Sequence, residues 1–242
     1  MFIISLAISD ELDNDYFLGV PTHTLCRLGA KDADLIQNGE VHRFILPVIL
    51  HLGFVHLVQN SVFLLIIGSM FEVIVQPLRF IAVYLVAGIG GNLLSSLASD
   101  SLAAGASTSL SGLTGGLVSF LIVNWIAMES TKQIRCCLTC FIVVIALMTV
   151  VLALIDISTS ASNVDNWGHL GGFFTGLLFA MSIMPILKTA KRRDSMPGMT
   201  FEKYCKIFGG AATILWLGIG ITMLFTERDP QSICSRFKSV IQ

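Results

Sequence analysis

Formal charge is confined to short stretches of this chain, and this segregation limits the fold more than any other feature. Six intervals of about 20 residues or more contain no Lys, Arg, Asp or Glu. A helix needs about 20 apolar residues to cross a hydrocarbon core of ~30 Å. The intervals therefore predict an all-α polytopic membrane protein, with spans at about 53–71, 79–98, 106–126, 136–157, 167–187 and 207–226.

Basic residues predict how these spans are oriented, because loops on the cytosolic side of a membrane carry an excess of Lys and Arg. The short loops 99–105 and 158–166 contain neither residue. The connections at the other ends of the same helices contain Arg79, Lys132, Arg135, Lys188, Lys191, Arg192, Arg193, Lys203 and Lys206. We therefore expect those connections to be cytosolic and the short loops to be lumenal or extracellular.

The spans divide the chain into segments. Residues 1–9, MFIISLAIS, are apolar but too short to cross a membrane, and they lack the basic flank and cleavage site of a signal peptide. They are either the remnant of a first helix or a half-inserted segment. The expected organisation continues with a core at 10–187, a basic cytosolic connection at 188–206, an additional spanning helix at 207–226 and a tail at 227–242.

The six cysteines suggest two different roles. Cys136, Cys137 and Cys140 lack a fourth ligand nearby for zinc, so we expect buried small apolar residues and no metal site. Cys26 and Cys234 both fall on the non-cytosolic side, where a disulfide between them could persist. The near-neutral net charge of -1 favours no nucleic-acid partner; the partner that the apolar spans require is the lipid bilayer.

Several polar side chains lie inside the apolar spans, where they are costly and usually face the bundle interior. His56 and Asn60 are four residues apart and share one helical face. With Ser107 and His169, they occupy the early turns of three helices that run in the same direction. A serine, a histidine and two hydrogen-bond donors at one depth fit acyl transfer. No Asp or Glu matches that depth in the spans, so the pattern favours a Ser-His dyad.

Small residues on two of these helices would let them approach closely. Gly112, Gly115 and Gly116 precede Gly172 and Gly176 on the later helix, at three- and four-residue spacing. Close packing there would bring Ser107 within reach of His169. Each feature has a plainer interpretation, since serine and glycine in membrane helices most often serve packing. Only their combination points to a catalytic site.

At this point the residues resemble the rhomboid family of intramembrane serine proteases. The resemblance covers about residues 25 to 180 and includes the pattern H-x4-H-x3-N at His51, His56 and Asn60. The remaining motifs, in chain order, are "GSMFE" ending at Glu72, "GIGGNLLSSL" at 88–97, "GAS" at 105–107 and "GHLGGFFTG" at 168–176. A seventh helix after the six-helix core resembles the eukaryotic secretory-pathway branch, which implies that residues 1–9 are a truncated first helix.

The resemblance implies a rhomboid-like helical bundle and a role for each matched residue. Ser107 would be the nucleophile and His169 its base, with His56, Asn60 and the Ser107 N–H forming the oxyanion hole. The residues expected to support the site are His51, Arg43, Glu72, Gly105 and Gly172. His51 would hydrogen-bond loop or backbone groups. The helix at 136–157 and the loop at 158–166 would form a lateral gate and cap.

The family's substrates are single-span membrane proteins, cleaved near the outer or lumenal membrane surface without a metal or cofactor. We therefore expect an integral membrane protease of the secretory pathway or plasma membrane rather than the mitochondrion. Thr108 replaces the usual Gly after the nucleophile, Ser111 replaces an aromatic residue, and His42-Arg43 replaces a Trp-Arg pair. A weak or inactive pseudoprotease that binds client helices is therefore the alternative. A small transporter is disfavoured by the lack of intramembrane acids.

Overall fold

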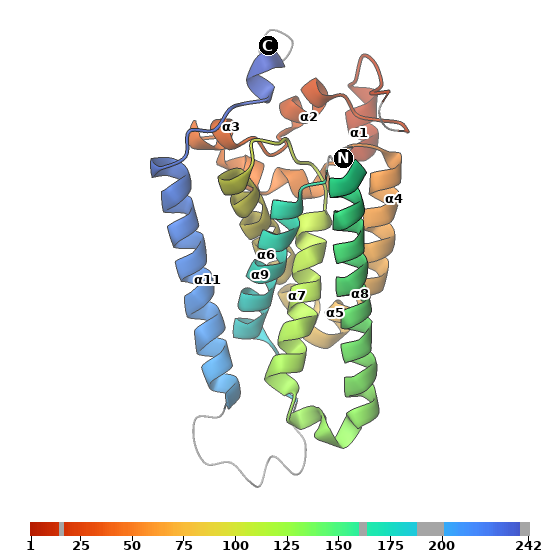
Figure 1. Cartoon of the computed structure of the whole chain (residues 1–242), viewed down its shortest axis with the longest axis vertical. Coiled ribbons are helices and arrows are strands. Elements are labelled where there is room, and N and C mark those ends of the chain that lie inside the picture. Colours follow the sequence, from red (N-terminus) through yellow and green to blue (C-terminus); the bar gives the residue numbers. More distant parts are fainter. Residues whose placement is uncertain (15–16, 160–163, 188–200, 238–242) are drawn as a thin grey trace.

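The computed structural model describes residues 1–14, 17–159, 164–187 and 201–237, and most of these residues lie in helices (Figure 1). The α-helices are α1 Phe2–Ala7, α2 Thr22–Leu28, α3 Ala33–Gln37, α4 Phe54–Phe63, α5 Ser69–Val75, α6 Pro77–Ala98, α7 Ser107–Asn124, α8 Lys132–Thr159, α9 Asn166–Ile183 and α11 Phe201–Thr226. A π-helical turn, Leu64–Gly68, joins α4 and α5 into one continuous span. No strand occurs in the described ranges, where only two isolated β-bridges form.

The described residues contain five helices that are long and apolar enough to cross a membrane. They correspond to five of the six expected spans, and the chain is an all-α polytopic membrane protein. The sixth expected span is α9, which has 18 residues but begins with Asn166, His169 and several glycines. Because α9 packs against α6, α7 and α11, much of its surface meets protein, although Trp167, Leu170 and Phe174 remain exposed.

Helices α4, α7 and α9 all begin at the same end of the bundle (Figure 1). The short helices α2 and α3 and the C-terminal part of the described chain lie at that end as well. The parallel direction expected from the order of the spans is therefore confirmed. Residues near the start of α4, α7 and α9 share one depth, which we call the outer end.

The centre of the bundle is a contact between the backbones of α7 and α9. A Cβ on Gly176 would collide with the main chain of Gly112, and a Cβ on Gly115 would collide with the carbonyl oxygen of Phe173. A Cβ on Gly172 would likewise meet the Thr108 carbonyl. The close helix approach predicted from the glycine spacing is confirmed, and it depends on the absence of side chains at these positions.

The additional helix α11 packs against the side of this pair. The indole Nε1 of Trp216 donates a hydrogen bond to Oγ1 of Thr175 on α9, at 2.9 Å. Gly209 contacts the backbone of α9 at Leu178, and Gly220 approaches Leu93 of α6. α11 therefore buttresses α9 on the side away from α7.

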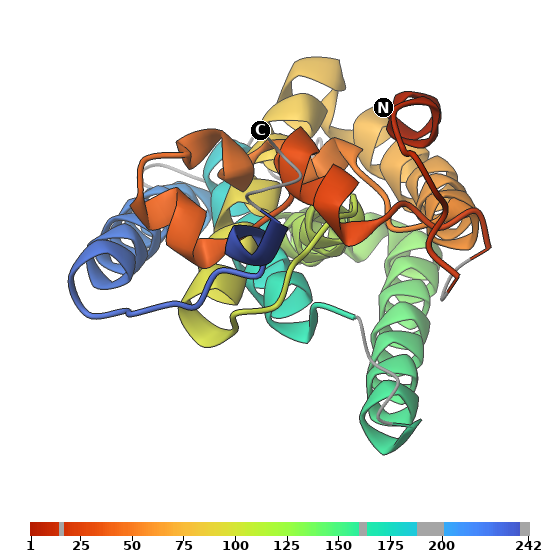
Figure 2. The same ribbon diagram turned by 90° about the horizontal axis from the view of Figure 1, so that it is seen from above.

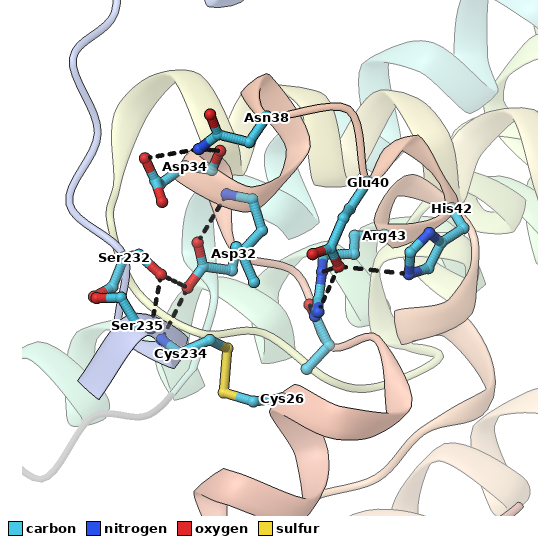
Figure 3. Close-up of polar contacts among 12 residues, drawn as sticks. Cys26, Asp32, Asp34, Asn38, Glu40, His42, Arg43, Ser232, Cys234 and Ser235 are labelled. Carbon is cyan, nitrogen blue, oxygen red and sulfur yellow. Dashed lines mark hydrogen bonds and ion pairs between the residues drawn. A yellow bond between two sulfur atoms is a disulfide. The ribbon is translucent and has the colours of Figure 1, made fainter. Parts of the chain in front are cut away.

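A disulfide between Cys26 and Cys234 joins α2 to the C-terminal tail, with the two Cα atoms 5.4 Å apart (Figure 3). Asp32 reinforces this junction by accepting hydrogen bonds from the Ser232 hydroxyl and the Cys234 N–H, both at 3.0 Å. The pairing suggested by the sequence is confirmed. It fixes the tail to the outer end of the bundle.

α8 stands at the edge of the bundle (Figure 2). Only 6% of the apolar stretch Ala127–Met148 is buried inside the protein, against 78% of Ser107–Asn124. Consequently the prediction that Cys136, Cys137 and Cys140 are buried is wrong, because all three are exposed.

Two expected segments fall partly outside the described residues. They are the cap loop at 158–166, of which 160–163 are not described, and the basic connection at 188–206, of which 188–200 are not described. Residues 1–9 include α1, whose Phe2 packs with Val20, Leu25 and Leu50 in a small apolar cluster at the outer end. Whether α1 is the remnant of a longer helix stays a prediction.

The glycine contact predicts a sharp difference between two identical substitutions. Gly176→Ala places a methyl against the Gly112 backbone and should lower the free energy of unfolding by about 1–3 kcal/mol through overpacking. Gly218→Ala on α11 is the matched control, since a Cβ there meets nothing within 4 Å. Thermal unfolding in detergent micelles measures both. Equal melting temperatures for the two variants would contradict the account of the α7–α9 contact.

Candidate active site

Ser107 is the first residue of α7 and is half-buried at the outer end of the bundle. No side chain caps this helix N-terminus. The first N–H groups of a helix have no intrahelical acceptor, and the helix dipole makes this end favourable for negative charge. The hydroxyl of Ser107 therefore lies next to backbone donors that are suited to an oxyanion.

The two residues that follow Ser107 point toward neighbouring helices. Thr108 is buried, and its side chain packs against Gly91 of α6 and Gly168 of α9. Ser109 is fully buried, with its Oγ directed at Gly88 of α6. The structure thus accommodates the bulkier Thr108 between two glycines. Ser109 is closed off from any substrate, so of these three residues only Ser107 has an accessible hydroxyl.

Gly105 sits two residues before Ser107 and touches the polar face of α4. A Cβ at this position would lie 2.6 Å from Cε1 of His56 and 3.5 Å from Nδ2 of Asn60. The Gly105 N–H donates to the Pro47 carbonyl at 2.9 Å, which anchors this turn to the preceding loop. A glycine is therefore required here so that His56 and Asn60 can approach the start of α7.

Two polar side chains of α4 that lie beside Gly105 have atoms without a hydrogen-bond partner among the described residues. Nδ1 of His56 and Nδ2 of Asn60 are both buried without a hydrogen bond. A buried unsatisfied polar group costs about 1–3 kcal/mol, so such groups require an explanation beyond stability. One explanation is that these side chains donate hydrogen bonds only when a ligand is transiently bound.

His51 precedes α4, is buried, and meets the ring of His56 edge-on with 5.6 Å between ring centroids. The expected hydrogen bonds from His51 to loop or backbone groups are not formed, because neither ring nitrogen has a partner among the described residues. Burial lowers the pKa of His51 to about 4, and the nearby His56 and N-terminal ammonium contribute. His51 is therefore a neutral ring that packs against His56.

His169 is in the first turn of α9, and its side chain is half-buried. Its backbone N–H donates to the Asp165 carbonyl at 3.0 Å. The Asp165 carboxylate caps α9 by accepting from the Gly168 N–H at 2.9 Å. Since Gly168 and Gly172 both contact Thr108, the first turns of α7 and α9 touch on either side of the residue after Ser107.

The remaining expected supporting residues lie far apart. Arg43 is buried in the loop before α4, where it pairs with Glu40 at 2.7 Å and donates to the Ala30 carbonyl at 2.8 Å (Figure 3). These contacts, one of them with the segment just after α2, suit a structural role in the outer loop. Glu72, in α5 near the opposite end, is exposed.

Sequence reasoning missed Lys31, whose side chain is fully buried at the outer end. Its backbone forms a bridge with Ala103, just before Gly105, and its Nζ donates to the Ser99 carbonyl at 3.4 Å. Burial lowers the pKa of Lys31 to about 8. Asp165, Asp32 and Asp100 oppose the shift, whereas Arg228 adds to it. A single lysine between Ala30 and Asp32 is typical of an exposed surface loop. The sequence therefore contains no signal that this lysine is buried.

Comparison with known proteins agrees with this geometry. A family model described as "Rhomboid domain" matches residues 38–186. The chain is 33% identical over 230 residues to "RHOMBOID-like protein 6, mitochondrial" of Arabidopsis thaliana, covering 90% of this chain and 72% of the relative. It is 33% identical over 164 residues to "Rhomboid protease GluP" of Bacillus subtilis (67% and 30%). It is 34% identical over 179 residues to "Rhomboid-like protease 3" of Toxoplasma gondii (73% and 62%).

These relatives correct one expectation. One of them is named as mitochondrial, so the preference for the secretory pathway or plasma membrane over the mitochondrion is not borne out. The chain also spans only 30% of the bacterial relative and 62% of the parasite relative. Multi-pass insertion in a membrane is supported by the apolar helices, independently of the compartment.

The buried Lys31 predicts an unusual dependence of stability on pH. Because its folded-state pKa of about 8 lies below the unfolded value of 10.5, the charged form is penalised in the fold. The penalty is complete below pH 8 and is relieved as pH rises toward 10.5. Lys31→Met should therefore stabilise the fold at pH 7. Its free energy of unfolding should be higher by up to about 3 kcal/mol, which appears as a higher melting temperature.

The advantage of Lys31→Met should shrink steadily between pH 8 and pH 10. Thermal unfolding of both proteins at each pH gives the difference in their stability. Contributions from other titrating groups are the same in both proteins and cancel in this difference. Lys31→Arg is the control, since arginine keeps its charge throughout this range. A difference between wild type and Lys31→Met that is constant with pH would show that the ammonium is not desolvated.

Proposed function

Because the chain belongs to the rhomboid family, we propose that it is an intramembrane serine endopeptidase that uses Ser107 and His169. The observation that carries the proposal is the contact between the first turns of α7 and α9, which brings an accessible serine and a histidine to the same end of the bundle. The nearby unsatisfied donors of α4 supply the remaining requirement of acyl transfer.

In the proposed reaction His169 accepts the Ser107 hydroxyl proton as Oγ attacks the scissile carbonyl carbon. The tetrahedral intermediate then collapses, and His169 delivers the proton to the departing amine. Water, activated by the same histidine, hydrolyses the acyl-enzyme and regenerates Ser107. A serine-histidine dyad can perform these steps without a carboxylate as a third catalytic residue. The Asp165 carboxylate is engaged with the α9 N-terminus instead, where it fixes the turn that carries His169.

The oxyanion would be stabilised by donors from two helices. The Ser107 N–H belongs to the uncapped start of α7. His56 and Asn60 approach from α4 across Gly105. These donors are held in place before substrate arrives, and preorganised donors of this kind commonly contribute 10²–10³-fold to acyl transfer.

The substrates we propose are single-span membrane proteins that unwind near the outer surface. α8 has few contacts with the bundle, so a transmembrane segment could enter beside it from the lipid. A locally unwound peptide could then reach Ser107, which lies at the outer end of α7. α8 and the loop that follows it would form the gate and cap.

A catalytically weak or inactive protein that binds client helices is the second candidate. Ser111 favours it, since this half-buried residue one turn after Ser107 has no ring to stack on His169. Thr108 is weaker support for an inactive protein, because Gly91 and Gly168 leave room for its side chain. The same fold would serve both functions, so only chemistry separates them.

The dyad predicts which serine is essential. Ser107→Ala and His169→Ala should each reduce cleavage of a co-expressed single-span substrate by roughly 10⁶-fold, which is to background in this assay. Ser109→Ala is the matched control, because this hydroxyl is buried against α6 and should be dispensable. Immunoblotting for the released fragment measures cleavage. Persistent cleavage by Ser107→Ala together with its loss in Ser109→Ala would refute the assignment.

The oxyanion hole predicts a graded effect. Asn60→Ala and His56→Ala should each lower kcat by about 10²–10³-fold with little change in KM, because the donors act on charge that exists only in the transition state. Kinetics with a purified substrate in detergent separate the two constants. An increase in KM at unchanged kcat would instead assign these residues to substrate binding.

A further inference from the structure

Three thiols are gathered in the first turns of α8, at the end of the bundle opposite the active site. Cys136, Cys137 and Cys140 are all exposed, whereas Cys205 on α11, another free cysteine, is buried. Nothing in the proposed proteolytic reaction uses them. Within the described residues no group of three or more His, Cys, Asp or Glu is arranged to hold a metal ion.

The same face of α8 continues as an exposed apolar surface. Val143 and Leu147 follow Cys136 and Cys140 at helical spacing, and they are 50% and 60% exposed. Because α8 is a membrane-spanning helix with few protein neighbours, this surface faces lipid hydrocarbon. A chain attached to these thiols would lie directly along an apolar surface.

The depth of the thiols is marked by Arg135 and Trp125. The Arg135 guanidinium lies 4.4 Å from the centroid of the Trp125 ring and donates to the Trp125 carbonyl at 3.2 Å. Aromatic and basic side chains gather at the interface between membrane and water. Cys136 and Cys137 immediately follow Arg135, and Cys140 lies about one turn deeper. All three thiols are therefore close to the headgroup region.

The two ends of the molecule differ in the pairing of their cysteines. The outer end carries the Cys26–Cys234 disulfide, whereas the three α8 cysteines are free. Disulfides persist in oxidising compartments, and free thiols in reducing ones. The disulfide favours an oxidising compartment at the outer end, and the excess of basic residues at the other end places the start of α8 on the cytosolic side, where acyl-coenzyme A is available as a substrate.

From this combination we propose that Cys136, Cys137 and Cys140 form an S-acylation site that accepts long-chain fatty acyl groups. A cysteine thiolate attacks the thioester carbonyl of a long-chain acyl-coenzyme A. The new sulfur–carbon bond forms as the bond to coenzyme A breaks, and the coenzyme A thiolate takes up the proton that the cysteine released. No oxidant or reductant is needed. Juxtamembrane cysteines are the usual acceptors of this modification.

The attached chain would hold the cytosolic start of α8 at the membrane. Each buried methylene of an acyl chain strengthens membrane attachment. α8 is the spanning helix with the least burial in the protein among those described, so it gains most from such an anchor. The modification would restrict the helix that borders the proposed substrate entrance without altering any residue of the active site.

The test is metabolic labelling of the full chain with an alkynyl palmitate in a eukaryotic host, followed by click detection of the purified protein. Wild type should carry label that neutral hydroxylamine releases, as a thioester requires. The triple variant Cys136→Ser, Cys137→Ser, Cys140→Ser should carry at least fivefold less of this label than wild type. Cys205→Ser, the matched control with a buried thiol, should keep it.

Label in wild type no higher than in the triple variant, or label that resists hydroxylamine, would overturn the proposal. An acyl-exchange reaction that adds a polyethylene glycol mass to each acylated cysteine gives a second, independent count. Ser107→Ala should retain full label in both measurements. Because that variant lacks the proposed nucleophile, failure of the protease proposal and failure of the acylation proposal are distinguished.

Discussion

The backbone contact between α7 and α9 is the constraint on which the rest of the structure depends. Within a membrane, apolar burial does not favour one helix neighbour over lipid, so association relies on close packing. Gly112 and Gly176 provide it by letting two main chains touch. The contact continues outward through Gly172 and Thr108 to the first turns of both helices, and these turns carry Ser107 and His169. Packing and catalytic geometry are thus one feature.

The outer end adds a second layer of fixation around the proposed site. Asp32 and the disulfide hold the C-terminal tail against α2 and α3, while the Lys31–Ala103 bridge ties the loop before α7 to the same region. Asp165 caps α9 one turn before His169. The buried Lys31 and the unsatisfied atoms of His56 and Asn60 all cost stability. Such costs are typical of sites that are preorganised for a ligand.

Much of this arrangement follows from local sequence features. Charge-free intervals located the spans, because lipid tolerates no unpaired charge, and glycine spacing located the α7–α9 contact. The predicted side of the membrane permitted a disulfide between Cys26 and Cys234 but did not require one. What could not be predicted depends on tertiary surroundings. Lys31 is buried because distant parts of the chain meet around it, among them the loop that contains Ser99 and Ala103. The α8 cysteines are exposed because no helix among the described residues covers them. His51 lacks its expected hydrogen bonds, and its ring instead packs edge-on against that of His56.

The central claim is that the contact between α7 and α9 creates one activated serine at Ser107. Its most direct test is reaction of the detergent-solubilised protein with a fluorophosphonate, followed by tandem mass spectrometry of the modified peptide. The account predicts a single phosphonylated residue, Ser107, and no adduct in His169→Ala, because the histidine is needed to activate the hydroxyl. An adduct on Ser109 or Ser111, or none on folded wild-type protein, would contradict it.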